Sequence, residues 1–117
     1  MGDRSVIQIN SDSFAYPISL YGHWAGEDNL RAVKIVLDQP EARVGDASYL
    51  TAQLFFWFST ALGGYDGELG YGIDTGSHDP DWLDNPIVYI NADTGDYTYE
   101  GITYNRNHEV IKETTND

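Results

Sequence analysis

Alternating apolar and polar positions near the start of the chain predict a β-hairpin. The alternation runs weakly over residues 6–9 and again over residues 14–21, with a polar turn cluster at residues 10–13 between the two runs. Short alternating runs on either side of a turn are typical of paired antiparallel strands. Pro17 has no backbone N–H to donate to a ladder, so we expect the second strand to lie at a sheet edge or to bulge there.

Helical spacing replaces the alternation after Glu27 and Asp28. Acidic residues favour the first turn because the amino end of a helix carries partial positive charge. The apolar stripe of this helix is Leu30, Val33, Val36 and Leu37. Pro40 cannot continue a helix, so we expect this one to end near Asp38.

A second helix is predicted over residues 47–62, with Asp46 or Ser48 as its N-cap and a Gly-Gly pair as its exit. Its apolar stripe consists of Leu50, Leu54, Trp57, Phe58, Ala61 and Leu62. Phe55 and Phe56 extend the apolar character around most of the cylinder. Such a helix must be covered on more than one side, by the sheet and the first helix or by a second subunit. We therefore expect a homo-oligomer formed through helix 47–62.

Short strands return in the second half of the chain. Residues 69–73 form a strand with glycines on one face, which lets a backbone or ligand approach, and residues 74–86 form a loop. Residues 87–91 and 96–100 predict the clearest hairpin, with Gly95 in a left-handed position and a short extension at 102–104.

The order of these elements, ββααβββ, predicts an α+β fold. We expect an antiparallel sheet of about four or five strands with two helices packed on one face. Residues 1–104 would form the single domain, and residues 105–117 a polar C-terminal tail.

Charge narrows the partners that such a domain could bind. Nineteen acidic residues against six basic ones give a net charge of −13. This surface repels phosphate backbones and anionic lipids, which argues against direct binding of nucleic acid or membranes and favours a basic protein. An acidic coat is also typical of proteins from high-salt organisms, so the charge alone leaves a solubilising role open.

Cysteine usage and hydropathy bear on the compartment. Cysteine is absent, which excludes disulfides and thiolate chemistry and fits a reducing cytosol. The longest apolar run, residues 54–58, is too short to cross a bilayer, and the N-terminus lacks the charged-then-apolar pattern of a signal peptide. We therefore expect a cytoplasmic protein.

The segment between the second strand and the first helix is one candidate binding site. In this reading Tyr21, His23, Trp24 and Arg31 would hold a nucleotide-like ligand, with Trp24 as the stacking platform. In the alternative reading Trp24 fills the core and His23 satisfies a backbone carbonyl, because a strand-to-helix turn uses the same residue types.

Carboxylates after residue 65 form the second candidate site. Its members are Asp66, Glu68, Asp74, Asp79, Asp81 and Asp84. A hard cation could be held by Asp74, Asp79, Asp81 and Asp84, with His78 nearby, but their spacing does not match a calcium loop, and a solvated loop explains them as well. We predict no metal site. The tyrosines of the sheet half, Tyr65 to Tyr104, are a third candidate recognition face or ordinary strand residues.

No motif for catalysis accompanies these features. The three histidines lack zinc-site spacing, no Gly-x-Ser-x-Gly elbow occurs, and no phosphate-binding loop or dinucleotide fingerprint is present. We therefore predict a protein without catalytic residues or a cofactor.

Several short stretches carry a resemblance to a known group of proteins. Residues 1–7, 20–27, 47–51 and 70–73 resemble small acidic bacteriophage proteins, particularly those of actinobacterial phages. The likeness spans most of residues 2–100, and the polar tail after Tyr104 departs from it. It implies a viral or prophage origin and action inside the host cell, but it assigns no activity and no functional residue.

Charge, missing catalytic signature and resemblance together favour a phage-type accessory protein that acts by binding. The expected mode is stoichiometric inhibition of a host factor, with carboxylates between residues 66 and 84 presented to a basic groove. The alternatives are a protein that sequesters a small ligand or nucleotide near Tyr21 and Trp24, and an acidic protein of a high-salt organism.

Overall fold

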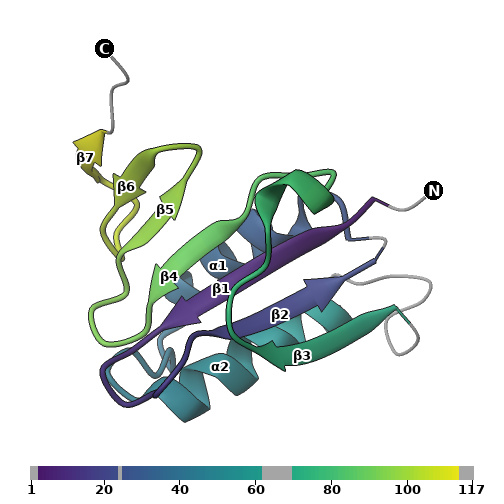
Figure 1. The fold of residues 1–117 in the computed structure, drawn as a ribbon. Helices are drawn as coiled ribbons and strands as arrows, with labels where there is room; N and C mark the ends of the chain where they lie inside the picture. The colour runs from purple at the N-terminus through teal and green to yellow at the C-terminus, as the bar shows by residue number, and fades with distance from the viewer. Residues whose placement is uncertain (1–2, 24, 62–69, 114–117) are drawn as a thin grey trace.

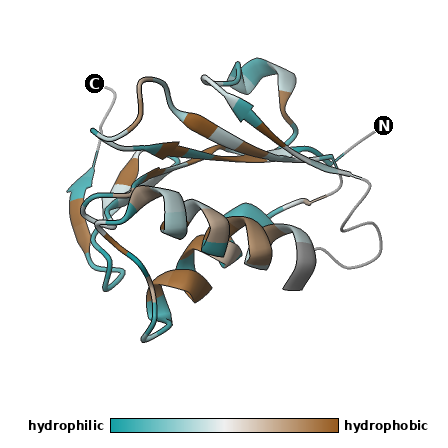
Figure 2. Ribbon diagram, turned by 90° about the horizontal axis from the view of Figure 1, so that it is seen from below, coloured by the Kyte–Doolittle hydropathy of each residue, from teal (hydrophilic) through white to brown (hydrophobic). Residues whose placement is uncertain are grey.

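The fold is a mixed β-sheet with two helices packed on one face (Figures 1 and 2). The computed structural model describes residues 3–23, 25–61 and 70–113. The strands are β1 (Ser5–Asn10), β2 (Ile18–Gly22), β3 (Tyr71–Thr75), β4 (Val88–Asn91), β5 (Tyr97–Tyr99), β6 (Ile102–Tyr104) and β7 (Val110–Glu113). The helices are α1 (Asp28–Asp38) and α2 (Ala47–Phe55), and α2 continues into the π-helix η1 (Phe56–Ala61). A 3₁₀ turn, η3 (Pro80–Trp82), lies between β3 and β4.

The predicted α+β class and the packing of both helices on one face are confirmed, but the predicted sheet is wrong in two respects. Over the described residues it has seven strands in the order β3-β2-β1-β4-β5-β6-β7, and β1 pairs with β4 in parallel. Parallel neighbours need a long crossover, and here the whole segment from β2 to β4 supplies it. The sequence pattern between residues 11 and 87 does not reveal which strand β4 joins.

The end of the chain also differs from its prediction. Residues 105–113, expected as a polar tail, form a turn and then β7, which pairs antiparallel with β6. His108 in the turn has a positive φ of 67°. All four residues of β7 are exposed, so the sequence has no need to alternate apolar and polar residues there, and that alternation is the signal by which a strand is predicted.

His108 ties this C-terminal hairpin to α1. Its Nε2 lies 2.7 Å from the Asp38 carboxylate and its Nδ1 lies 2.7 Å from the Tyr97 hydroxyl. Burial raises the pKa of Tyr97 to about 12, so the hydroxyl is protonated at neutral pH. The neutral Nε2–H tautomer satisfies both contacts, because the carboxylate can only accept and the hydroxyl then donates to Nδ1.

The sequence predicted an edge position or a bulge for β2 because of Pro17, but β2 is an interior strand. β2 lies between β1 and β3, and Pro17 immediately precedes its first residue, Ile18. Here the missing N–H breaks no ladder bond, and the Pro17 carbonyl accepts a 2.6 Å hydrogen bond from the Gly76 N–H. A proline just outside a strand is thus compatible with an interior position.

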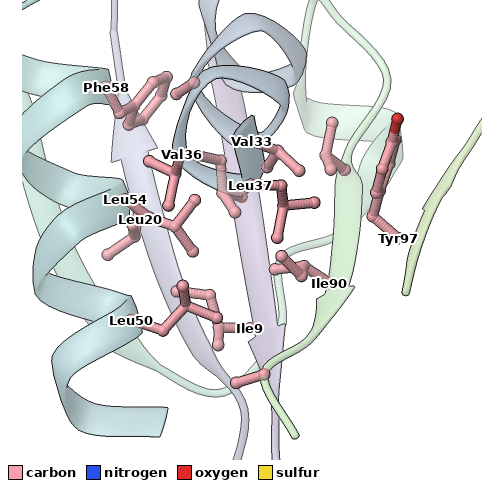
Figure 3. Packing of buried hydrophobic residues seen from close by; sticks show 14 of the residues in the cluster. Ile9, Leu20, Val33, Val36, Leu37, Leu50, Leu54, Phe58, Ile90 and Tyr97 are labelled. Carbon is pink, nitrogen blue, oxygen red and sulfur yellow. The ribbon is translucent and has the colours of Figure 1, made fainter. Parts of the chain in front are cut away.

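The hydrophobic core fills the space between the helices and the sheet (Figure 3). α2 and η1 contribute Leu50, Leu54 and Phe58, which are spaced four residues apart and fully buried. The facing residues of the sheet and α1 are Ile9, Leu20, Ile90, Val33, Val36 and Leu37. The helical spacing read from the sequence therefore identified Val33, Val36 and Leu37 of α1 and Leu50, Leu54 and Phe58 of the second helix as buried, whereas Leu30 and Trp57 are only partly buried.

Gly22, at the end of β2, is required by this packing. A Cβ at this position would lie 2.7 Å from Ala25 Cβ and 2.7 Å from Tyr71 Cε1. Cβ atoms essentially never make contacts this short. Glycine therefore allows Ala25 and Tyr71 to pack directly against the backbone of β2. The glycine face predicted for β3 has a different character, because a Cβ on Gly72 would meet open space.

The buried amide of Asn29 joins α1 to the sheet. Its Nδ2 donates to the carbonyl oxygens of Val6, at 3.1 Å, and Pro86, at 2.9 Å. Its Oδ1 accepts from the backbone N–H of Leu30 at 2.8 Å. The side chain thereby satisfies one carbonyl in β1 and one just before β4, the strand that pairs with β1. These hydrogen bonds fix the first turn of α1 against the sheet.

Over the part of the chain that the structure describes, no helix has the length and apolar character needed to cross a membrane.

Candidate functional site

The connection from β3 to β4 crosses the sheet on the face opposite the helices. It leaves the edge strand β3, passes over β2 and β1, and carries η3 before it reaches β4 (Figures 1 and 2). The side chains of the connection and those of this sheet face are the ones that the helices leave uncovered. We call residues 74–84, which begin with the last two residues of β3, the acidic loop.

The first part of the acidic loop is fixed to β2. The Ser19 hydroxyl donates to the Gly76 carbonyl at 2.6 Å. The His78 ring stacks on Tyr21 with 5.9 Å between centroids and an interplanar angle of 18°. The His78 Nε2 lies 3.5 Å from the Asp74 carboxylate, whereas its buried Nδ1 has no hydrogen-bond partner.

The far end of the loop is fixed to the start of the chain. The Asp84 carboxylate accepts from the backbone N–H of Arg4 at 2.8 Å and from its Nε at 3.3 Å. Both hydrogen bonds lower the pKa of Asp84, and the one from the backbone N–H has the larger effect. Asn85 Nδ2 donates to the Asp3 carboxylate at 2.8 Å and to the Arg4 carbonyl at 2.9 Å.

The 3₁₀ turn η3 lies between these two attachments and presents Trp82. The Asp79 carboxylate accepts from the backbone N–H of Asp81 at 2.9 Å, which caps the turn. Pro80 follows the cap and restricts φ at the start of the turn. Trp82 is 71% exposed, although tryptophan has one of the largest apolar surfaces of any side chain. A short, capped turn thus holds an aromatic ring in solvent.

Trp82 is the functional candidate that sequence reasoning missed. The available signal was a tryptophan inside a segment of prolines and aspartates with little apolar company. A core tryptophan normally belongs to an apolar periodic run, and this one does not. Its exposure depends on the hydrogen bonds at both ends of the loop, which a sequence does not reveal.

The structure brings part of the predicted acidic set together. Asp74, Asp79, Asp81 and Asp84 are all exposed and belong to the acidic loop with Trp82. Asp66 and Glu68 of the acidic set and Trp24 of the predicted ligand site lie outside the described residues.

Other exposed carboxylates are spread over the rest of the described surface. They include Asp3, Asp12, Glu27, Asp38, Glu41, Glu100, Glu109 and Glu113. The acidity of the chain is therefore partly a general coat. What distinguishes the acidic loop is the combination of four exposed carboxylates with a large exposed aromatic ring.

The predicted ligand site near Tyr21 is assembled only in part. The Tyr21 hydroxyl lies 3.1 Å from His23 Nδ1, and the two rings meet edge to face at 6.5 Å. Arg31 lies in the helical layer, where its guanidinium pairs with Asp28 at 3.0 Å. Tyr21 stacks on His78 on the opposite face of the sheet, so the sheet separates the arginine from the phenol.

Four of the tyrosines in the sheet half belong to the core region, whereas Tyr89 is half-buried outside the core cluster. Tyr71, Tyr97, Tyr99 and Tyr104 pack in or against the hydrophobic core, and Tyr97 stacks on Tyr104 at 5.0 Å. Burial raises the pKa values of Tyr71 and Tyr99 above the ordinary value. These rings contribute to the stability of the sheet, and Tyr65 lies outside the described residues.

Within residues 3–23, 25–61 and 70–113, no group of three or more His, Asp or Glu side chains is arranged to hold a metal ion.

The chain matches no protein-family model, no curated protein sequence and no solved structure.

Proposed function

We propose that this protein acts by binding a basic protein partner through the acidic loop, with Trp82 as the anchor. The observation that carries the proposal is Trp82, 71% exposed and surrounded in sequence by four exposed aspartates. Tryptophan is enriched among the residues that dominate binding energy at protein interfaces. Exposed carboxylates around it favour a partner whose groove is lined with lysine or arginine.

The attachments of the acidic loop strengthen this proposal. Binding costs less free energy when the contact residues are already held in place, because less conformational freedom is lost. Hydrogen bonds from Ser19, Arg4 and Asn85 and the cap of η3 hold the loop in this way. The loop therefore has the properties of a preformed docking element.

Stoichiometric inhibition is the mode of action that we propose for this contact. The resemblance to small acidic phage proteins supports action in the cytoplasm of a bacterial host. An inhibitor of this kind occupies a basic groove, such as one that otherwise holds a phosphate backbone, and it needs neither catalytic residues nor a cofactor. The net charge of −13 supplies the long-range attraction.

The test compares proteins captured from an actinobacterial lysate by the immobilised wild type and by Trp82→Ala. Quantitative mass spectrometry identifies the captured proteins, and calorimetry then measures the affinity of the purified candidate. Removing the anchor is expected to cost about 2 kcal/mol, or roughly a 30-fold loss of affinity. Ile111→Ala, which shortens an exposed apolar side chain on β7, serves as the control and is expected to bind normally.

A charge-matched pair of variants tests the electrostatic part. Asp79→Asn with Asp81→Asn removes two loop charges and keeps the oxygen that caps η3. Glu109→Gln with Glu113→Gln removes two exposed charges elsewhere. We expect only the loop pair to weaken binding strongly, and the wild-type affinity to fall with salt. Equal losses from both pairs would show that the partner responds to net charge and not to the acidic loop, and an affinity unaffected by Trp82→Ala would show that Trp82 is not the anchor.

A small-ligand site at Tyr21 is the second candidate function. The observation in its favour is that the Tyr21 ring is flanked by two imidazoles, from His23 and His78. A nucleotide bound there would raise the melting temperature, because a ligand of the folded state stabilises it by mass action. Thermal-shift measurements with a panel of nucleotides at millimolar concentration test this, and no shift with any of them removes the candidate.

A further inference from the structure

The exposed side of α2 and η1 is an apolar surface that the acidic loop does not use. Tyr49 is 59% exposed and Phe56 is 53% exposed, and Ala52 lies between them in sequence at helical spacing. We call these three residues, with the groove beside them, the α2 face. It belongs to the helical layer, on the opposite side of the sheet from the acidic loop (Figure 2).

A groove of about 280 Å³ adjoins Phe56. Its walls include Val36 of α1, Glu41 of the connection, and Ala52, Phe56 and Trp57 of α2 and η1. Phe56 meets Trp57 edge to face, with 5.8 Å between centroids and an interplanar angle of 86°. Gln39 and Gln53 complete the lining, so the groove is mixed, with apolar walls and a polar edge. The α2 face thus has an exposed aromatic ring beside a depression, which is a shape that can be complementary to a copy of itself.

The helix changes its geometry at this surface. Phe56 is the first residue of the π-helix η1, and π-helical turns are rare and concentrate at functional sites. The wider helical turn begins at Phe56, whose side chain is exposed, and the buried stripe continues two residues later at Phe58. The association of π-helical turns with functional sites favours a use for the surface at Phe56.

Charge distinguishes a second copy of the chain from other occupants. Residues 47–65 contain no charged side chain and form the longest such stretch in the sequence. Two copies with a charge of −13 each repel one another over most of their surfaces, and they meet at the lowest electrostatic cost where a helix surface without charged side chains is exposed. A basic partner would gain little from this face and is attracted to the acidic loop instead.

Two side chains of opposite charge border the α2 face. Glu41 lines the groove, and the guanidinium of Arg43 lies 4.5 Å from the centroid of the Tyr49 ring and pairs with Asp46 of the same copy at 2.7 Å. In a twofold arrangement each surface patch faces its own copy, so a patch that carries both signs can pair them across the axis. The same rim offers a partner of uniform charge no such match.

We propose that the chain forms a twofold dimer through the α2 face, with Phe56 of each copy inserted into the groove of the other. The dimer buries the two aromatic rings that are most exposed on the helical layer, Tyr49 and Phe56. It leaves both acidic loops free on the outer surfaces. This arrangement is independent of the proposed partner, and either can hold without the other.

Light scattering and sedimentation of the wild type, Phe56→Asp and Trp82→Asp test the dimer. Both substitutions place a charge on an exposed aromatic position, so the folded state survives, and circular dichroism verifies this. We expect a mass twice 13.1 kDa for the wild type and Trp82→Asp, and about a 100-fold weaker dimer for Phe56→Asp. Because salt screens the repulsion between copies, the dimer should tighten from low to high salt, opposite to the binding of a basic partner.

A wild-type mass of 13.1 kDa at about 1 mM protein in both salt conditions would overturn the dimer and leave the face to a different protein. Equal weakening by Phe56→Asp and Trp82→Asp would show that copies associate elsewhere. A dimer that dissociates as salt rises would show that charged surfaces, and not the α2 face, hold the copies together.

Discussion

Phe58→Ala is expected to lower the free energy of unfolding by about 3–5 kcal/mol, the range typical of buried phenylalanines. Phe58 is fully buried at the centre of the helix layer, and its ring meets Tyr71 edge to face at 5.2 Å. It also closes the space around Gly22 together with Ala25. Its removal leaves a cavity between η1 and the β2–β3 end of the sheet. Urea denaturation followed by circular dichroism measures the change.

Phe56→Ala is the matched control for this prediction. It removes the same side chain two positions away, from a site that is 53% exposed. We expect a loss below about 1 kcal/mol, because little apolar surface returns to water. Dimer dissociation also lowers apparent stability, so both variants are compared at the lowest protein concentration that gives a signal. Similar losses for the two phenylalanines would contradict the burial described here.

Asn29→Asp is expected to have a comparable effect without changing the size of the side chain. The substitution replaces the amide that donates to the Val6 and Pro86 carbonyls with a carboxylate that can only accept. At pH 7 the buried charge would face two carbonyl oxygens. A charge that is buried without a compensating partner typically lowers the free energy of unfolding by about 3–5 kcal/mol. Urea denaturation at several pH values measures the effect.

The pH dependence of this variant has a definite sign. Burial and the facing carbonyls disfavour the charged form, so the pKa of the introduced carboxyl rises above its value in the unfolded chain, about 3.9. The unfolded state then ionises first, and the stability of the variant relative to wild type falls as pH rises from that value to the folded pKa. We expect the smallest deficit near pH 4 and the full deficit at pH 7.

Asn107→Asp adds the same charge at an exposed position in the β6–β7 turn and serves as the control. It should leave the free energy of unfolding within about 0.5 kcal/mol of wild type at both pH values. A deficit of Asn29→Asp that does not change between pH 4 and pH 7 would contradict the buried position of the amide.

The periodicity of the chain was sufficient to locate most elements. The stripe Leu50, Leu54 and Phe58 and the hairpin of β4 and β5 follow directly from side-chain spacing, because a helix or strand with one buried face repeats its apolar positions. Gly95 adopts the left-handed conformation that the turn requires, with φ of 84°. β7 shows the limit of this reasoning, since a strand exposed at every residue has no pattern to detect.

The candidate site was predictable only in part. Composition and the run of aspartates indicated residues 74–84, because many carboxylates in a short loop are visible as letters. The exposure of Trp82 could not be read from the sequence. It depends on hydrogen bonds that fix the loop and Asn85 to Ser19, Arg4 and Asp3, which lie about 60 to 80 positions away in the chain. Arg31 was grouped with Tyr21 because the two are near in sequence, but the fold places Arg31 on α1, where it pairs with Asp28.

The sequence by itself determined the α+β class, the apolar faces of both helices and the excess of negative charge, since these depend on local spacing and on counts of residues. The tertiary structure alone decided the parallel pairing of β1 with β4, the face over which the acidic loop crosses, and the exposure of Trp82 and Phe56. These features arise from contacts between distant segments. Such contacts depend on which surfaces fit and which buried polar groups find partners, and neither property is encoded in any short stretch of the chain.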